Sequence, residues 1–401
     1  MNVWIVNPYG TLPSEGWREY RSSMLARALV KRGHHPTWFL SNFEHRSKSF
    51  RQDQRLDPAL PGVTIHCLPA RPYQRNISFS RIRYEQSFGK AFQKAVQDMP
   101  KPDCIVLAEP CLFFGEPVRR YARENAIPLV VDILDLWPEM FALALPNTFR
   151  PAARTLFAPL YARRSRLFRE ATGIVGCTAS YSNVARKVSC GPVETFYLGV
   201  DVDDVQQSMH DIPVNLRLPA FDGLTCVYAG TLGEAYDIPC LAAAVTMLPK
   251  SAAVRIVVAG AGPERTRLEQ LALVHPNTLI FLGEIAPHQL GAIYAQAQIG
   301  LCSYAVGSTV EMPVKLFDYL AAGLAVITSL EGEITTLIDA GAGVRCNAGD
   351  APALVAALTS LAQRPDQVSA MQKVAARFGC KFDQYQQHAG FSEFIEQLAH
   401  P

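Results

Sequence analysis

Residues 311–323, EMPVKLFDYLAAG, contain a lysine and an aspartate at a spacing that permits shared chemistry. Pro313 suits the first turn of a helix, and the apolar residues after it recur at helical spacing. Lys315 and Asp318 are three residues apart, so a helix places them on one side. Lys315 lies in the first turn, where the helix dipole disfavours a cation. A bound diphosphate would stabilise the lysine there; the alternative is an exposed Lys–Asp pair contributing about 0.2–0.5 kcal/mol.

Two glycine turns in the same half follow apolar runs. They are YAGTLGE, with Gly230 and Gly233, and VAGAGPE, with Gly260 and Gly262. Glycine lets the backbone approach a phosphate closely, and a helix amino end presents free N–H groups to an anion. Neither turn has the spacing of a dinucleotide fingerprint or a P-loop, so each one alone also fits a simple strand-to-helix connection. Combined with Lys315, they indicate a nucleotide site in which Asp318 accepts hydrogen bonds from ribose hydroxyls.

The first half carries charged residues at the ends of apolar runs. VVDILDLWPEM places Asp132 and Asp135 after a strand, and buried carboxylates are costly without partners. We therefore expect an active-site role for them, with Asp135 contacting the acceptor; the alternative is an aspartate that caps a turn. Arg18 and Arg21 stand at a helix start, where an anionic ligand would again offset the dipole, and a solvated face is the alternative.

Basic residues are concentrated in the first half. Residues 1–200 contain 27 Lys and Arg against 16 Asp and Glu, whereas the rest contains 11 against 20. Residues 149–173 and 71–96 interleave arginines with aromatic and aliphatic side chains; Arg163, Arg164 and Arg166 belong to the first of these stretches. Such helices can lie on anionic lipid, and the alternative is a core-packed helix with a charged outer face. The acidic second half argues against nucleic acid.

Composition fits a folded, reduced protein of two domains. The chain has 401 residues, of which 49% are hydrophobic and 18% charged, and we find no run of about 18 uncharged apolar residues. The start MNVWIVNPYG reads as a strand rather than a signal peptide. The ten cysteines form no C-x-x-C pair, which argues against a structural zinc site. Scattered cysteines of this kind fit a reducing compartment, and we expect a cytoplasmic location.

Strand-like runs alternate with helical patterns throughout, as in parallel sheets covered by helices. The expected strands are VWIVN, PTWFL, CIVLAE, PLVVDILD and TGIVGC in the first half, and LTCVYAG, RIVVAG, TLIFLGE, IGLCSY and AVITS in the second. An acidic segment with Pro and Gly, residues 199–222, is the expected linker. Open α/β sheets bind ligands at the carboxyl ends of their strands, and the residues singled out above follow strands.

Together EMPVKLFDYLAAGLAVI, VYAGTLG, VVAGAGPE and DILDLWPE resemble the retaining glycosyltransferases of family 4, nearly over the whole chain. The resemblance implies the α/β GT-B fold, with two Rossmann-like domains facing each other across a cleft. We expect an acceptor-binding domain at 1–199, a nucleotide-sugar-binding domain at 200–384, and a terminal helix at 385–401 returning to the first domain. Within the family the match is closest to enzymes of bacterial surface polysaccharides, such as lipopolysaccharide.

The resemblance also assigns residues. Asp318 takes the place of a ribose-binding glutamate, and Glu311 is the candidate for the sugar-contacting glutamate, since the expected position holds Val310. No Arg/Lys pair follows the first glycine turn, which leaves Lys315 to neutralise the leaving diphosphate. The other residues assigned to the donor are Gly16, Gly230, Thr231, Gly260, Gly262, Glu264, Glu284 and Pro313.

The resemblance implies transfer from a UDP- or GDP-sugar, without cofactor or metal, to a polyprenyl-diphosphate-linked or glycan acceptor. Such a hexosyltransferase-like enzyme would lie at the inner face of the cell membrane. It implies front-face attack, in which the leaving phosphate helps to deprotonate the acceptor. The alternatives are a sugar-nucleotide epimerase of the same fold and a non-catalytic binding subunit.

Overall fold

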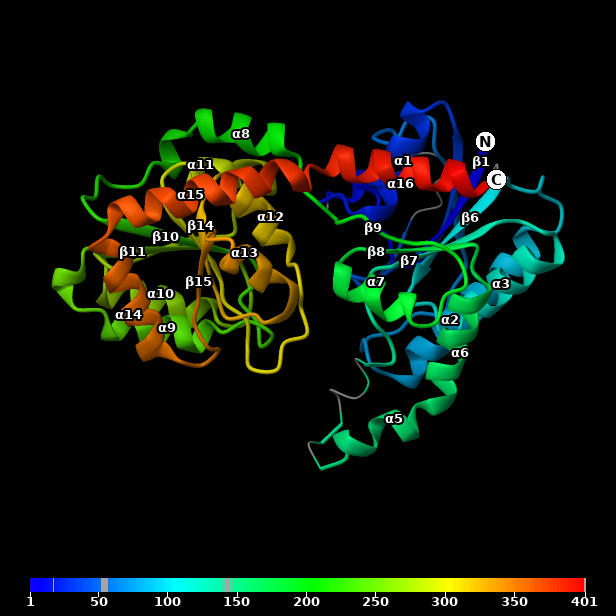
Figure 1. Cartoon of the computed structure of the whole chain (residues 1–401), viewed down its shortest axis with the longest axis horizontal. Coiled ribbons are helices and arrows are strands. Elements are labelled where there is room, and N and C mark those ends of the chain that lie inside the picture. The colour runs from blue at the N-terminus through cyan, green and yellow to red at the C-terminus, as the bar shows by residue number, and fades with distance from the viewer. Residues whose placement is uncertain (17, 52–56, 140, 142–144, 147, 400–401) are drawn as a thin grey trace. The chain divides into compact units, whose positions relative to one another are not determined.

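A computed structural model describes residues 1–16, 18–51, 57–139, 141, 145–146 and 148–399. Its contacts divide the chain into two compact units (Figure 1). The first comprises Met1–Leu198 and Tyr385–Pro401, and the second comprises Gly199–Gln384. Each unit is built on a parallel sheet, as the alternation of strands and helices predicts.

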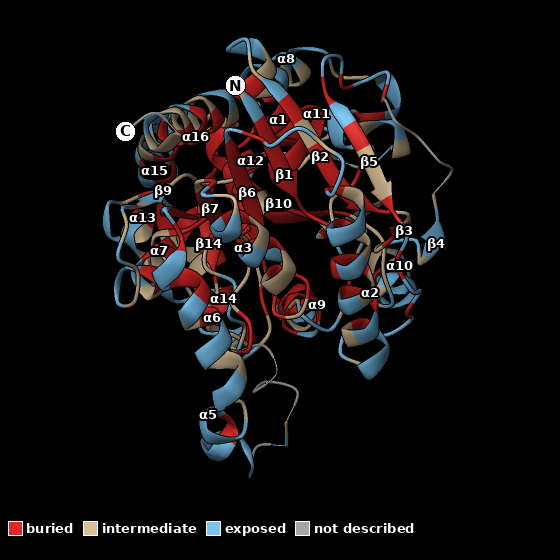
Figure 2. Ribbon diagram, turned by 90° about the vertical axis from the view of Figure 1, so that its right-hand side faces the viewer, coloured by how far each residue is buried: buried red, intermediate tan, exposed pale blue. Residues whose placement is uncertain are grey.

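The sheet of the first unit has the strand order β5-β2-β1-β6-β7-β8-β9, and all pairs are parallel. The strands are β1 Asn2–Val6, β2 His35–Ser41, β5 Thr64–Leu68, β6 Cys104–Glu109, β7 Leu129–Ile133, β8 Gly173–Gly176 and β9 Val193–Thr195. A hairpin of β3 Phe43–Glu44 and β4 Ser49–Phe50 lies outside this sheet. The central strands β6 and β7 are buried along their whole length (Figure 2), because helices cover both faces.

The helices of the first unit include one from the end of the chain. They are α1 Arg21–Lys31, α2 Phe79–Ala95, α3 Gly115–Glu124, α5 Ala153–Leu156, α6 Ala158–Glu170, α7 Ala179–Arg186 and α16 Gln384–Ala399. Helix α16 contributes Phe391, Phe394 and Ile395 to a core that also contains residues of β1, β2 and α1. The expected terminal helix is therefore part of the first unit's packing.

The second unit has a sheet of strand order β12-β11-β10-β13-β14-β15, again parallel. Its strands are β10 Leu224–Ala229, β11 Val254–Ala259, β12 Leu279–Gly283, β13 Ile299–Cys302, β14 Ala325–Thr328 and β15 Gly343–Arg345. Its helices are α8 Val202–His210, α9 Ile238–Met247, α10 Arg265–Val274, α11 Leu290–Tyr294, α12 Val314–Ala321, α13 Thr335–Asp339, α14 Ala351–Ala362 and α15 Pro365–Gly379.

The prediction of an irregular linker at 199–222 is wrong in part, because this segment contains α8. Asp201 caps the helix, since its side chain accepts a hydrogen bond from the Asp204 amide at 2.9 Å. Asp203 and Asp204 lie in the first turn, where the helix dipole favours carboxylates. The acidic run is thus a helix start. In the described part of the chain, no helix is both long and apolar enough to cross a membrane.

The packing of α16 predicts a specific loss of stability. Phe391 is fully buried and stacks on Phe196 with ring centroids 5.8 Å apart. Phe391→Ala should lower the free energy of unfolding by about 3–5 kcal/mol, as for other large buried aromatic residues. Tyr385→Ala, at a position 51% exposed on the same helix, is the matched control. Urea titrations of both variants test this; equal stability would contradict the packing of α16.

Candidate active site

Helix α12 carries both residues of the Lys–Asp pair, and it is buried rather than exposed. Pro313 precedes its first turn in an extended conformation, and every residue from Lys315 to Ala321 is buried. Lys315 is 8% exposed and Asp318 is 4% exposed. The alternative of an exposed ion pair on the surface is therefore wrong, and a positive charge is buried at the amino end of a helix.

The ammonium group of Lys315 has no hydrogen-bond partner among the described residues. It lies over three tyrosine rings, 3.9 Å from the centroid of Tyr228, 4.6 Å from Tyr236 and 5.4 Å from Tyr304. Burial lowers the pKa of Lys315 to about 8. Aromatic faces attract a cation but do not accept its three hydrogen bonds, so the group is poised to bind an anion.

The glycine turns lie beside this ammonium. A Cβ atom at Gly230 would stand 2.8 Å from Lys315 Nζ, and one at Gly260 would stand 1.8 Å from the Gly230 carbonyl oxygen. The two turns are joined by backbone hydrogen bonds; for example, the Leu232 amide donates to the Ala261 carbonyl oxygen at 2.9 Å. Gly230, Gly260 and Gly262 all have positive φ. Glycine is therefore required there to bring two loops and the lysine together.

The other residues expected at the donor take varied positions. Thr231 and Glu284 are exposed, and Glu264 forms an ion pair with Arg267 at 3.5 Å. The Glu311 carboxylate accepts a hydrogen bond from the Glu333 amide at 2.8 Å, which holds the turn at 332–334. Its expected contact with the sugar stays a prediction.

The unpaired charge of Lys315 predicts an unusual pH dependence. Because its folded pKa is lowered from 10.5 to about 8, the unfolded chain binds more protons between these values, and stability rises as pH rises through this range. At pH 7 the buried charge costs roughly 3 kcal/mol. Lys315→Met should therefore be more stable than wild type at pH 7 without ligand, by an amount that shrinks toward pH 10.

Urea titrations at pH 7, 9 and 10 measure this difference. Lys250→Met, which replaces an exposed lysine of the same unit, is the control and should show no such trend. A Lys315→Met protein less stable than wild type at pH 7 would mean that the ammonium is satisfied in the folded state.

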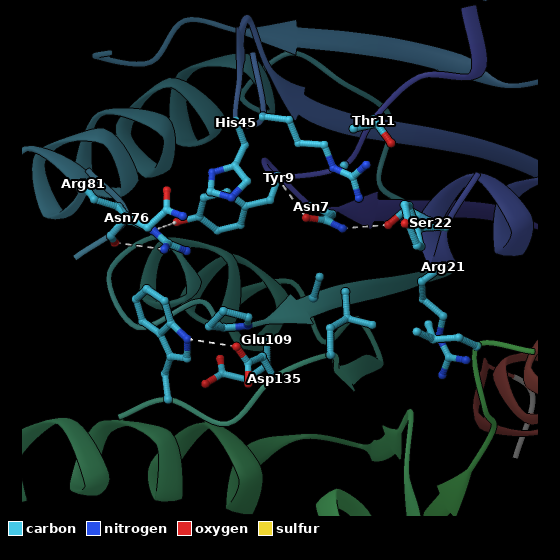
Figure 3. Close-up of a pocket in the computed structure, with 18 of the residues that line it drawn as sticks. Asn7, Tyr9, Thr11, Arg21, Ser22, His45, Asn76, Arg81, Glu109 and Asp135 are labelled. Atoms are coloured by element: carbon cyan, nitrogen blue, oxygen red, sulfur yellow. Dashed lines mark hydrogen bonds between the residues drawn. The ribbon is translucent and has the colours of Figure 1, made fainter. Parts of the chain in front are cut away.

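The first unit has a cavity of about 540 Å³ where β1, β6 and β7 end (Figure 3). This is the edge at which parallel sheets bind ligands. Polar residues from each of these strand ends and from two other segments converge on it, namely Asn7, Tyr9, Thr11, His45, Asn76, Arg81, Glu109 and Asp135. It is therefore the candidate acceptor site of this unit.

Two carboxyl groups line one side of the cavity. Asp135 accepts hydrogen bonds from the Leu136 amide at 2.9 Å and the Trp137 indole at 3.3 Å, and burial raises its pKa. Glu109 is fully buried, and its Oε2 accepts hydrogen bonds from the amide and the thiol of Cys111. Its Oε1 has no partner among the described residues, and burial raises its pKa to about 7. This pair can accept hydrogen bonds from a ligand hydroxyl, and Glu109 can also donate one.

A buried arginine faces the cavity from α2. Arg81 is 8% exposed, and its guanidinium carbon lies 4.0 Å from the Trp137 ring centroid and 4.7 Å from that of Tyr9. Its Nε donates to the Tyr9 hydroxyl at 3.2 Å, which in turn donates to Glu85 at 2.7 Å. His45 beside it has a pKa lowered to about 4, first by burial and then by neighbouring cations, so it is neutral at pH 7.

Arg21 lines the cavity of the first unit, and its counter-charge is Asp132. Arg21 is 2% exposed and donates from Nε and Nη2 to the Asp132 carboxylate at 3.0–3.1 Å. Its Nη1 donates to the carbonyl oxygens of Phe196 and Tyr197. These two charges offset each other, so Asp132 stabilises the cation at the helix start, and the expected contacts of Arg21 and Asp132 with the acceptor stay predictions.

The expected membrane contact of Arg164 is also wrong. Arg164 is buried, forms an ion pair with Glu139 and donates to the Trp137 carbonyl at 2.8 Å. It thereby holds the DLWPE segment. Arg163 is exposed but donates to the Leu112 carbonyl at 2.9 Å, and Arg166 is exposed on the outer face of α6. Arg164 thus belongs to the packed face of α6, whereas the expected membrane contact of Arg163 and Arg166 stays a prediction.

Gly16 and Arg18 precede α1 rather than forming its start. Gly16 is exposed with φ of 76° and ends the short turn Pro13–Glu15, and Arg18 is half-buried. Neither lines the cavity of the first unit. Their expected contacts with ligand stay predictions.

Several cavity residues were missed from the sequence. Glu109 ends an apolar strand, so the rule that selected Asp135 would also have found it. Arg81 carries no comparable signal, because helical periodicity does not distinguish one inward arginine in a basic amphipathic stretch. In the described ranges, no three His, Cys, Asp or Glu side chains are grouped as metal ligands.

The pairing of Arg21 with Asp132 predicts a non-additive double substitution. Arg21→Gln alone should destabilise the protein by about 3–5 kcal/mol, because it leaves a buried carboxylate without its counter-charge. Combined with Asp132→Asn, which removes that carboxylate charge, the loss should be clearly smaller than the sum of the single losses. Urea titrations of the cycle measure the coupling; additive losses would contradict the pairing.

Two family models match the chain, one within each unit. The model of the glycosyl transferase 4-like domain matches residues 19–193, and the model of glycosyl transferases group 1 matches residues 223–364. No curated protein matches the sequence at a significant level.

Solved structures with the same fold cover nearly the whole chain. Sucrose-phosphate synthase from Thermosynechococcus elongatus is 17% identical with a TM-score of 0.72, covering 99% of this chain and 98% of that one. WaaG, a glycosyltransferase involved in lipopolysaccharide biosynthesis, is 15% identical with a TM-score of 0.63, covering 98% and 99%. HepE of Anabaena in complex with UDP is 12% identical with a TM-score of 0.64, covering 99% and 100%.

The two Rossmann-like units define a GT-B protein, as expected. Since the two family models together cover most of the chain, it belongs to the glycosyltransferases of family 4 and is a glycosyltransferase enzyme. These matches disfavour the alternatives of an epimerase and a non-catalytic subunit.

Proposed function

We propose that this enzyme is a retaining glycosyltransferase that uses a nucleoside-diphosphate sugar in bacterial surface polysaccharide synthesis. The observation that carries the donor assignment is the buried ammonium of Lys315, which lacks a hydrogen-bond partner among the described residues and adjoins the Gly230 turn. A diphosphate there would accept the hydrogen bonds that tyrosine rings do not. Asp318, one turn further on, would bind the ribose.

The donor is a UDP- or GDP-sugar, and no metal takes part. HepE, which shares the fold, was solved with UDP. Lys315 and the glycine turns would stabilise charge on the leaving diphosphate, which is the main electrostatic demand of glycosyl transfer. Asp135 would orient the attacking hydroxyl of the acceptor, and the leaving phosphate oxygen would take its proton.

The acceptor is a lipid-linked or glycan molecule at the inner face of the cell membrane. The named role of WaaG in lipopolysaccharide biosynthesis supports this choice. The segment 149–156, which ends in α5, supports membrane proximity, because Phe149 and Leu156 are each 62% exposed and flank the exposed arginines Arg150 and Arg154. Apolar and basic side chains together favour anionic lipid surfaces.

Thermal unfolding with UDP, GDP, ADP and TDP tests the donor site. One diphosphate should raise the Tm of wild type, since a ligand at a hundred times its Kd stabilises the folded state by about 2.7 kcal/mol. The same ligand should leave the Tm of Lys315→Met unchanged, because that variant lacks the ammonium.

Lys250→Met serves as the matched control and should respond like wild type. If no diphosphate shifts the Tm at millimolar concentration, or if the shift persists in Lys315→Met, the donor assignment fails.

A further inference from the structure

A second cavity adjoins the first one and differs from it in chemistry. Its volume is about 450 Å³, and its lining is mostly apolar, including Phe79, Ile82, Phe113, Trp137, Phe157 and Leu160. Asn76, Ile77, Arg81 and Trp137 line both cavities. The first cavity, here called the polar chamber, and the second cavity, here called the apolar groove, therefore meet at Arg81 and Trp137.

Arg81 presents a free donor at this junction. Nε and Nη1 are used by the Tyr9 hydroxyl and the Asn76 carbonyl, whereas Nη2 makes no hydrogen bond within the described ranges. No carboxylate of the described residues forms an ion pair with Arg81. The nearby Glu85 is fully committed, accepting from Tyr9 and from the Phe113 amide, and burial raises its pKa. The free donor of Arg81 at the junction therefore suits an anionic group.

The mouth of the groove exposes apolar side chains. Phe79 is 85% exposed and Ile77 is 52% exposed at the start of α2. Apolar residues gathered in this way beside a cavity indicate a surface that is covered in use. The mostly apolar lining suits a hydrocarbon chain and offers few hydrogen-bond partners for a sugar.

Trp137 lines the groove and also contacts Asp135. One face of its ring lies against Arg81, and its indole N–H donates to Asp135 at 3.3 Å (Figure 3). A ligand that fills the groove thus contacts the side chain that orients the carboxylate expected to bind the acceptor hydroxyl.

We propose that the acceptor is an anionic amphiphile bound across both cavities. Its phosphate binds Nη2 of Arg81, its hydrocarbon chain lies in the apolar groove, and its sugar occupies the polar chamber beside Asp135 and Glu109. This inference rests on the proposed glycosyltransferase function and selects, within its acceptor classes, a lipid phosphate rather than a free glycan or a soluble sugar phosphate.

Isothermal titration with farnesyl phosphate, farnesol and inorganic phosphate, below the micellar concentration, tests the proposal. Farnesyl phosphate should bind at least tenfold more tightly than farnesol or inorganic phosphate. Arg81→Gln should reduce its affinity to that of farnesol. Leu160→Trp fills the groove and should lower the affinity for farnesyl phosphate to that for inorganic phosphate. Leu156→Trp, at an exposed position outside the groove, should leave the affinity for farnesyl phosphate unchanged.

The Tm shift with the donor diphosphate shows whether each variant is folded and separates the two hypotheses. It should persist in Arg81→Gln and in Leu160→Trp. If that shift is present but farnesyl phosphate binds no better than inorganic phosphate, the amphiphile site is refuted while the donor site stands. Unchanged affinity in Arg81→Gln, or binding only to phosphatidylglycerol vesicles and not to farnesyl phosphate, would also overturn the proposal.

Discussion

The ammonium group of Lys315 is buried at the amino end of α12, where both the helix dipole and the loss of water disfavour a positive charge. Three tyrosine rings attract it, but they cannot accept its hydrogen bonds. The close approach of the Gly230 and Gly260 turns depends on the same small space, since a Cβ atom at either position would collide. The second unit is thus arranged around a buried cation whose hydrogen bonds are not satisfied by the described residues, which is the basis for the proposed donor site.

The first unit buries four arginines among its described residues, and one of them, Arg119, is paired with Glu116 and Glu170. Arg21 is balanced by Asp132, and Arg164 is balanced by Glu139 while it holds the segment before α6. Arg81 packs against the rings of Tyr9 and Trp137 and donates from Nε to the Tyr9 hydroxyl instead of to a carboxylate. Its Nη2 can therefore donate a hydrogen bond to a ligand in the cavity. The three buried arginines with carboxylate partners therefore stabilise the fold, whereas Arg81 keeps a donor that a ligand could use.

Much of the fold could be predicted from the sequence. The central strands are mostly apolar runs, because helices cover both faces of a parallel sheet, and the sequence predicts each of them as a strand. The edge strands β5, β9 and β15 are not among the expected strands, since all three are only partly buried and β9 and β15 have three residues each. The sequence predicts a linker where α8 lies, because its acidic first turn resembles a loop, although the helix dipole makes those residues suitable for a helix start.

What the sequence alone determined was the alternation of strands and helices, the position of Lys315 in a first turn, and the carboxylate after the DIL run. These follow from short-range spacing along the chain. Only the tertiary structure decided which charges are satisfied. Arg21 and Asp132 are 111 residues apart and Arg81 and Tyr9 are 72 apart, and such pairs arise only when the strands are ordered in the sheet. Periodicity identifies a face, whereas the partner on that face is set by the element packed against it.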